Sequence, residues 1–437
     1  MIDLDEHVDL ERGVMSRRVF VDDDIYRLEL ERIFSRSWLF LAHESQLPKS
    51  GSFVSTYMGE DPVIVVRRSD GSIGAVLNSC RHRGMKVCRA DVGTTRVFRC
   101  SYHGWTYGLD GDLVSVPNMA EGYRNELDMS RWGLLRVPRV ESYKGLVFGT
   151  WDAEAQPVEE ALGDITFLLD TFLDRRPGGT EVIGGVQKWV MGGNWKLAAE
   201  QFASDMYHSF LLHASAWQSL APEGADLSEM VFPSVGSQMT SQGSGGGWFH
   251  DPTGAGSAVL GPMLAADYTD PAVWERLGEV QAGGPIGCHA TVFPNFSFLG
   301  AFRVLRVWHP RGPHEMEVWS WTLVDKDQSP EIKDAWRRFA SMTFGPTGTF
   351  EQDDGEIWTD LQRVSRGHIA QTVDLNYQMG IGHEVTDHPD YPGRINHVYS
   401  DNAARGFYER WLELMKTPLR PGQRGNATAR AGQEVTR

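Results

Sequence analysis

Four residues in two short motifs have the types and spacing of ligands to an iron–sulfur cluster. One residue separates Cys80 from His82, and two residues separate Cys100 from His103. Thiolates alone hold most iron–sulfur clusters, but in the Rieske type two histidines replace two cysteines on one iron, which raises the reduction potential. Because each motif supplies one cysteine and one histidine, the sequence predicts a [2Fe–2S] cluster that accepts and passes on single electrons.

The residues around these motifs predict hairpins. The strand-like runs Val63–Arg67 and Ser72–Leu77 flank an Asp70-Gly71 pair, which is a typical hairpin turn. Gly84 and Gly104 follow the two histidines by one or two residues, where a left-handed conformation or a close backbone approach would need glycine. We therefore expect the four ligands at loop tips of a small antiparallel domain.

A zinc site with two cysteines and two histidines is the alternative reading of the same residues. Zinc fingers favour two or more residues between the cysteines and a separate histidine pair, whereas here each cysteine has its own histidine. The spacing therefore favours the iron–sulfur cluster.

Length and charge restrict the class of protein. A chain of 437 residues is long enough for two or three domains, and its net charge of −16 argues against nucleic acid or an anionic membrane as a partner. The acidic start lacks the features of a signal peptide, and no apolar run is long enough to span a bilayer. We expect a soluble, cytoplasmic protein.

The segment between Cys80 and Cys100 is an exception to this acidity. Against the single acid Asp91 it carries six cationic residues, which are Arg81, Arg83, Lys86, Arg89, Arg96 and Arg99. Such a patch either docks an acidic electron donor or is neutralised by ion pairs within the protein.

A second group of possible metal ligands lies in and after a helix predicted to begin near Trp195. His208 and His213 have acids nearby, and two histidines with one carboxylate form the usual site for a mononuclear non-haem iron that activates dioxygen. Residues five apart on an α-helix point about 140° away from each other, so both can reach one metal only if the helix ends or loosens between them. Asp205 is three residues before His208, and is better placed to hydrogen-bond that imidazole than to bind the metal.

These motifs, taken together, resemble those of one enzyme family. Cys80-x-His82 with Cys100-x-x-His103, Asn194-Trp-Lys with Glu200-Gln-Phe, Asp205-x-Tyr-His208 to His213, and Phe344-Gly-Pro-Thr-Gly-Thr-Phe-Glu-Gln-Asp-Asp354 occur in the family's order. Over nearly its whole length the chain resembles the large (α) subunit of Rieske non-haem iron aromatic ring-hydroxylating dioxygenases, the group that contains naphthalene and biphenyl dioxygenases.

The resemblance implies a role for each motif. Cys80, His82, Cys100 and His103 would hold the [2Fe–2S] cluster, and His208, His213 and Asp354 would bind mononuclear Fe(II). Spacing alone leaves Asp353 as a competing carboxylate, whereas the family pattern favours Asp354. Asp205 would bridge His208 to His103 of a neighbouring subunit and carry the electron; the alternative is that it only orients His208.

The family also implies partners and a reaction. We expect a ring of three α subunits, often with three small β subunits, and electrons from NADH delivered indirectly by a reductase and a ferredoxin. The chain itself has no Gly-x-Gly-x-x-Gly or Gly-Lys-Ser/Thr motif in the context that binds a dinucleotide or phosphate. With O2 as co-substrate, the expected product is a cis-dihydrodiol.

The predicted fold is α+β, with an antiparallel-β Rieske domain inserted in a catalytic domain whose antiparallel sheet is covered by helices. We assign residues 1–37 to the N-terminal part of the catalytic domain, 38–156 to the Rieske domain, 157–420 to the mononuclear iron domain and 421–437 to a disordered tail.

The substrate is expected to be apolar. Positions that resemble the family's pocket are Gln201, Phe202, Met206, Leu212, His289, Asn295, Phe298, Phe344 and Phe350. From Gly192 to Leu220 the only Lys or Arg is Lys196, whereas an aromatic carboxylate would need an arginine in reach. We therefore expect an aromatic hydrocarbon of one to three rings. Arg303 or Arg306 on later strands could overturn this choice in favour of a carboxylate such as phthalate. A Rieske monooxygenase or dealkylase is the other alternative, and a simple electron carrier would need neither histidine of the second site.

Overall fold

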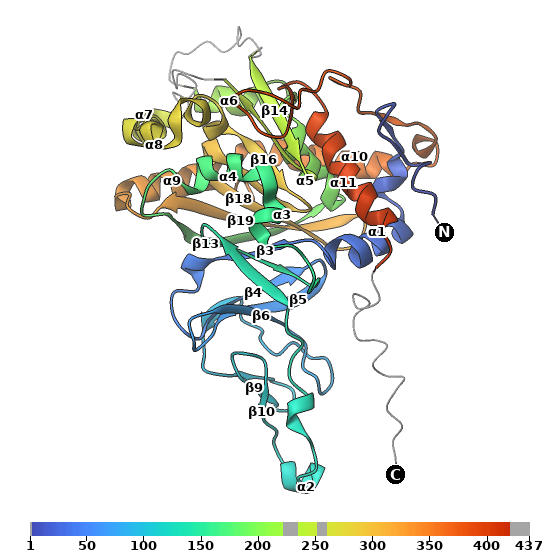
Figure 1. Ribbon diagram of the computed structural model, residues 1–437, viewed down its shortest axis with the longest axis vertical. Coiled ribbons are helices and arrows are strands. Elements are labelled where there is room, and N and C mark those ends of the chain that lie inside the picture. The colour runs from blue at the N-terminus through green and yellow to red at the C-terminus, as the bar shows by residue number, and fades with distance from the viewer. Residues whose placement is uncertain (1, 222–234, 251–259, 420–437) are drawn as a thin grey trace.

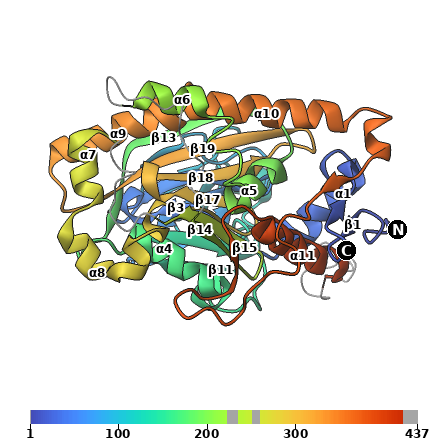
Figure 2. The ribbon, with the colours of Figure 1, turned by 90° about the horizontal axis from the view of Figure 1, so that it is seen from above.

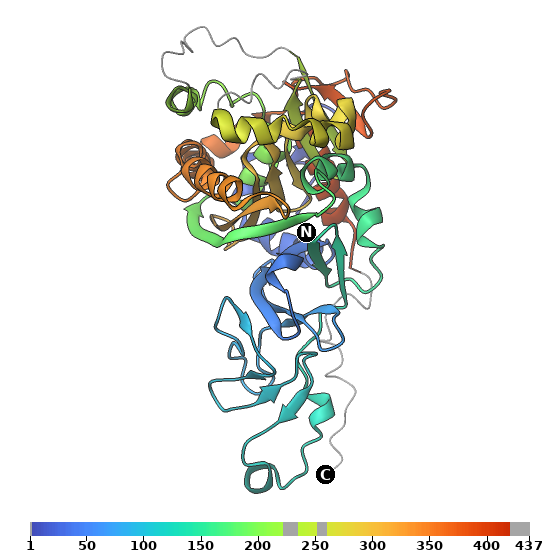
Figure 3. The ribbon, with the colours of Figure 1, turned by 90° about the vertical axis from the view of Figure 1, so that its left-hand side faces the viewer.

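The computed structural model describes residues 2–221, 235–250 and 260–419, and divides them between a smaller β domain and a larger α+β domain. Figures 1 and 3 show the smaller domain projecting from one end of the larger one. The predicted tail at 421–437 lies outside the described residues. None of the described helices is both long and apolar enough to cross a membrane.

Three small antiparallel sheets build the smaller domain. The first contains β6 (Ile73–Leu77), β5 (Asp61–Arg67), β4 (Ser52–Met58) and β7 (Val92–Thr94), and the second contains β10 (Leu113–Ser115), β9 (Thr106–Tyr107) and β8 (Phe98–Arg99). The third, of β11 (Arg139–Tyr143), β12 (Leu146–Thr150) and β3 (Leu39–His43), adjoins the larger domain. The predicted hairpin before the first motif is present as β5 and β6, with Gly71 at φ +86°.

An eight-stranded sheet forms the centre of the larger domain. Its order is β13 (Thr180–Gly192), β19 (Glu315–Asp325), β18 (Val304–Pro310), β17 (Phe296–Leu299), β16 (His289–Val292), β15 (Ser244–Phe249), β14 (Gly236–Ser241) and β21 (Arg394–His397), with every neighbour antiparallel. The predicted fold class is therefore confirmed.

Helices cover this sheet. Figure 2 shows α9 (Pro330–Phe344) and α10 (Thr349–Ser365) along the β13 edge, and α11 (Asn402–Lys416) near β14 and β15. Other helices of this domain are α4 (Thr166–Leu173), α6 (Ala214–Leu220), α7 (Gly261–Tyr268) and α8 (Pro271–Ala282). The N-terminal helix α1 (Asp23–Glu29) belongs with this layer, because the buried carboxylate of Glu29 accepts hydrogen bonds from Trp195 and Trp411.

The helix that leads to the second group of ligands is α5 (Trp195–Ser204), which packs on strands β15 to β18. The Asn194 side chain caps its N-terminus by accepting a hydrogen bond from the Lys196 amide. A glycine run in β15 lets the chain approach closely: a Cβ on Gly247 would lie 2.7 Å from Cγ of Met206, which follows α5. The helix ends at Ser204, before either histidine.

Candidate active site

The two cysteine–histidine motifs lie at the tips of two similar loops in the smaller domain. In each loop the glycine after the histidine donates its amide to the cysteine carbonyl, with Gly84 at φ +78° and Gly104 at φ +74°. These left-handed conformations are those that the sequence predicted for the two glycines. Cys80 and Cys100 are buried, whereas the histidines lie at the surface.

The two loops bring the two imidazoles together at the surface above the buried cysteines. Nδ1 of His82 and Nδ1 of His103 are 3.1 Å apart, and the Cys80 thiol also accepts or donates a hydrogen bond with Tyr107 at 3.3 Å. These four residues do not form a group close enough to hold a single metal ion. In the described part of the chain, the only such group of histidine, cysteine or acidic side chains lies in the larger domain. The arrangement fits a cluster larger than one ion, with sulfur donors inside and imidazoles outside, better than it fits zinc.

The six cations between the two cysteines are all exposed. None of them forms an ion pair with a described residue, because Asp91, the one acid of the segment, pairs with Lys188 of β13 at 2.9 Å instead. Arg81 donates to the Gly133 carbonyl and lies over the Trp132 ring. The alternative that internal ion pairs neutralise this patch is therefore wrong for the described chain.

His208, His213 and Asp354 come together in the larger domain. Nε2 of His208 lies 3.6 Å and Nε2 of His213 lies 3.3 Å from Oδ1 of Asp354, and the three ligand atoms all lie within 4.8 Å of one another. The helix that the sequence predicted ends before them, so a turn brings the two imidazoles together. Asp354 comes from α10 and is fully buried. Two imidazoles and one carboxylate are a donor set that suits non-haem iron.

Two further carboxylates orient the imidazoles. Oδ2 of Asp205 lies 3.3 Å from Nδ1 of His208, and Oδ2 of Asp353 lies 3.0 Å from Nδ1 of His213. Each carboxylate favours the tautomer that leaves Nε2 free for a metal. Asp353 and Asp354 thus have different neighbours: Asp354 faces both Nε2 atoms, and Asp353 faces only the far nitrogen of His213.

The electrostatics of His208 reflect this pairing. Burial opposes the charged imidazolium, but the adjacent carboxylate of Asp205 outweighs burial and raises the pKa of His208 to about 8. The nearby imidazole of His208, together with the His208 amide that donates to Asp205, lowers the pKa of Asp205 against the effect of burial. Asp205 is therefore ionised at neutral pH.

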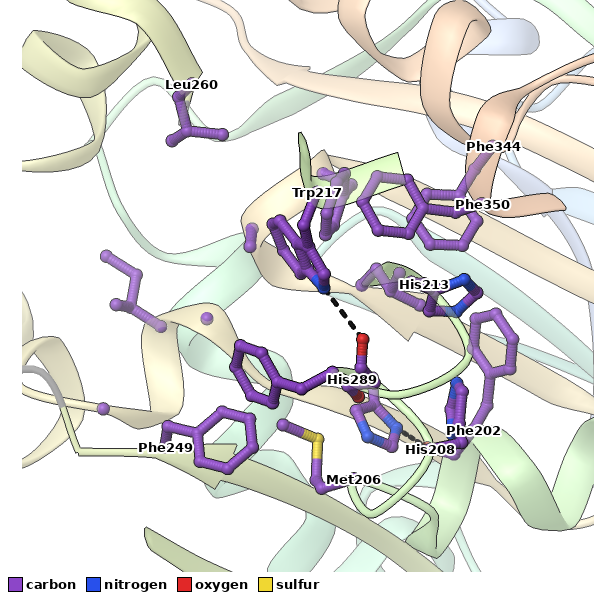
Figure 4. A pocket seen from close by; sticks show the side chains of 18 of the residues that line it. Phe202, Met206, His208, His213, Trp217, Phe249, Leu260, His289, Phe344 and Phe350 are labelled. Atoms are coloured by element: carbon purple, nitrogen blue, oxygen red, sulfur yellow. Dashed lines mark hydrogen bonds between the residues drawn. The ribbon is translucent and has the colours of Figure 1, made fainter. Parts of the chain in front are cut away.

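A cavity of about 480 Å³ opens beside these three residues (Figure 4). Six of the predicted pocket residues line it, which are Gln201, Phe202, Met206, His289, Phe344 and Phe350. The rest of the described wall, which no local motif could have revealed, includes Phe210, Trp217, Phe249, Leu260, Tyr268, Ile286, Leu299 and Phe302. The cavity is mainly aromatic and aliphatic.

Three predicted pocket residues do not line the cavity. Side chains alternate along β17, so Leu299 faces the cavity while Phe298 packs against Phe172 in the core. The Asn295 side chain donates to the Trp308 carbonyl at 3.0 Å and is buried. Leu212 is half-buried in the turn after His208, where Ser209 and Phe210 face the cavity instead.

The two arginines that could have favoured an acidic substrate are buried in ion pairs. Nη1 of Arg306 lies 2.6 Å from Glu351, and Nη2 of Arg303 lies 2.9 Å from Asp325. Neither lines the cavity, and the described wall contains no lysine or arginine. His289 is its most distinctive polar residue: burial lowers its pKa to about 4, and Nδ1 donates to the Phe202 carbonyl at 2.7 Å. The described wall therefore offers no lysine or arginine that could pair with a substrate carboxylate.

Known proteins match the chain over nearly its whole length. Residues 37–144 match the family described as Rieske [2Fe-2S] domain, and residues 178–417 match Ring hydroxylating alpha subunit (catalytic domain). The biphenyl dioxygenase subunit alpha of Paraburkholderia xenovorans (strain LB400) is 47% identical over 428 residues, covering 94% of this chain and 93% of that protein. The benzene 1,2-dioxygenase subunit alpha of Pseudomonas putida is 47% identical over 423 residues, covering 95% and 93%.

A solved structure agrees with these matches. A naphthalene 1,2-dioxygenase mutant bound to phenanthrene superposes with a TM-score of 0.87 at 35% identity, covering 94% of each chain. The two matched domains imply a Rieske [2Fe–2S] cluster and a mononuclear iron as cofactors. The resemblance predicted from the motifs is thereby confirmed, and the chain belongs to the α subunits of the Rieske ring-hydroxylating dioxygenases, which are oxidoreductases.

Proposed function

We propose that this subunit adds both atoms of O2 to adjacent carbons of an aromatic hydrocarbon of one to three rings, giving a cis-dihydrodiol. His208, His213 and Asp354 hold the iron, which supplies dioxygen activation when bound, and Cys80, His82, Cys100 and His103 hold the cluster. The observation that carries the proposal is the apolar cavity that opens directly on the two imidazoles and the carboxylate.

The chain's own residues position the reactants. Aromatic side chains on several sides of the cavity, among them Phe202, Phe350 and Trp217, bury a flat hydrocarbon and exclude water. Asp205 and Asp353 keep the two imidazoles in the orientation that a metal needs. The overall reaction takes up two electrons and two protons for each ring and each O2.

The substrate class is tested with matched compounds and purified protein, using a surrogate ferredoxin and reductase. Naphthalene and biphenyl should be converted, whereas phthalate should show a kcat/KM lower by about a hundredfold or more, because no lysine or arginine in the described wall offsets burial of its charge. Under ¹⁸O2 the diol should contain two labelled oxygen atoms. A product with one labelled atom would favour a monooxygenase, and preferred turnover of phthalate would overturn the substrate class.

We further propose that the electron donor is an acidic protein, such as a ferredoxin, that binds the exposed cations near the cluster. We also propose that the subunit assembles into a ring of α subunits, typically three, together with small β subunits. Support for the acidic donor comes from the six exposed cations between Cys80 and Cys100, none of which forms an ion pair with a described residue, in a chain whose net charge is −16. Opposite charges on exposed surfaces accelerate encounter, and salt weakens this effect.

A charge-reversal variant tests this electron-donor surface. Arg83→Glu combined with Arg89→Glu should slow cluster reduction by an acidic ferredoxin about tenfold at low salt, and the difference from wild type should shrink as salt is added. Arg338→Glu is the control, because Arg338 is also exposed but lies on α9 of the larger domain, where it pairs with Asp334 at 3.1 Å. Stopped-flow absorbance of the cluster measures the rate. Equal slowing in the control would remove the assignment of this surface.

A further inference from the structure

We infer that Gln201 is a positioning residue for Asp354, and that Trp358 fixes the orientation of Gln201. The inference rests on the proposed function, in which Asp354 is the carboxylate ligand of the iron. Gln201 lies inside α5, three residues before its end, and Trp358 lies one turn after Asp354 on α10. The two side chains meet between these helices.

Three distances define the contact. Oε1 of Gln201 accepts a hydrogen bond from the Trp358 indole at 2.6 Å, and Nε2 of Gln201 donates to Oδ1 of Asp354 at 2.7 Å. Nε2 of Gln201 is also 3.4 Å from Nε2 of His208. The amide therefore lies between an aromatic side chain of the core and the group that would bind the metal.

The chemistry of the partners determines which way the amide faces. An indole N–H can only donate a hydrogen bond, so the oxygen of Gln201 must face Trp358. The NH2 group must then face Asp354, and it does so by donating to the carboxylate oxygen Oδ1. A carboxylate oxygen has two lone pairs, so Oδ1 of Asp354 can accept this hydrogen bond and still bind a metal. The orientation of Gln201 thus follows from Trp358 and needs no metal.

Burial makes this arrangement rigid. Trp358 is fully buried, and its ring packs against Trp308 at 5.3 Å and Phe202 at 6.4 Å between centroids. Gln201 and Asp354 are buried as well, at 9% and 1% exposed. Removing the amide therefore leaves the buried carboxylate of Asp354 free to turn and lacking one hydrogen bond. Outer groups that orient a metal ligand typically change metal affinity by about 10 to 100-fold.

The test measures Fe(II) affinity of the cluster-loaded protein, by anaerobic titration against a competing chelator. Gln201→Met keeps the length of the side chain and removes both hydrogen bonds, so it should weaken Fe(II) binding by about tenfold or more. Trp358→Phe should weaken it by a smaller factor. Because Trp358 acts through Gln201, Trp358→Phe should add little further loss in the Gln201→Met background.

Trp308→Phe is the matched control. It removes another buried indole, whose N–H binds Ser297 at 2.8 Å and not Gln201, so Fe(II) affinity should stay that of the wild type. Equal losses from Trp308→Phe and Trp358→Phe would show a general packing effect and overturn the inference, as would wild-type affinity in Gln201→Met. If His208→Ala abolishes Fe(II) binding while Gln201→Met does not, only this inference fails. If His208→Ala also binds Fe(II) normally, the proposed iron site fails.

Discussion

His208→Ala should keep the red-brown colour of the Rieske cluster and lose the mononuclear iron together with turnover. The cluster loops belong to the smaller domain and His208 to the larger one, so the cluster should assemble normally. Loss of one of three protein donors leaves a site too weak to retain Fe(II). We expect kcat to fall by about a thousandfold or more, which corresponds to about 4 kcal/mol of transition-state stabilisation. Iron and sulfide analysis with visible spectra, on the same samples used for turnover, provides the measurement.

His289→Ala is the control for this variant. His289 is also a cavity-wall histidine, but its Nδ1 is used by the Phe202 carbonyl and it does not belong to the group that could hold an ion. It should retain wild-type iron content, whatever its effect on substrate binding. Full iron content and activity in His208→Ala would contradict the assignment of the metal site.

Sequence reasoning worked best where chemistry depends on residues close together in the chain. The cluster motifs, their glycine turns and the β5–β6 hairpin are local patterns, and the structure contains all of them. Helix geometry alone required the helix to end or loosen between His208 and His213; in the structure α5 ends earlier, at Ser204, so neither histidine lies on it. Asp354 lies about 140 residues further along the chain, and only the family resemblance connected it with His208.

The cavity wall shows where such reasoning fails. Leu299 and Phe298 are adjacent apolar residues, and only the register of β17 decides which one faces the cavity. Likewise, nothing in the sequence around Arg306 indicated that Glu351 neutralises it in the core. The ion pair joins strand β18 to helix α10, which lie far apart in the sequence. Tertiary packing determines both outcomes, and a single sequence does not encode it in any local pattern.

Asp205→Ala should leave both metal centres in place and slow electron delivery by about a hundredfold. The carboxylate contacts Nδ1 of His208 at 3.3 Å, yet 44% of its side chain is exposed, so it also faces outward. His103 and Tyr102 are exposed in the smaller domain, which projects away from the domain that contains α5 (Figure 1). In the proposed ring, Asp205 of one subunit accepts a hydrogen bond from the cluster histidine of the next. Single-turnover reoxidation of the reduced cluster, with substrate and O2 present, measures the rate.

Asp353→Ala separates this bridging role from simple orientation of an imidazole. Oδ2 of Asp353 lies 3.0 Å from Nδ1 of His213, much as Asp205 lies beside Nδ1 of His208. The Asp353 side chain is only 27% exposed, and it contacts His213 instead of His208. If Asp205 only orients its histidine, both variants should lose iron affinity, by about tenfold, and recover similar rates once iron is saturating. If Asp205 carries the electron, its variant alone should remain slow with the iron site full. With the iron site full, a slow rate could not be attributed to loss of metal, and near-normal reoxidation in Asp205→Ala would exclude the bridge.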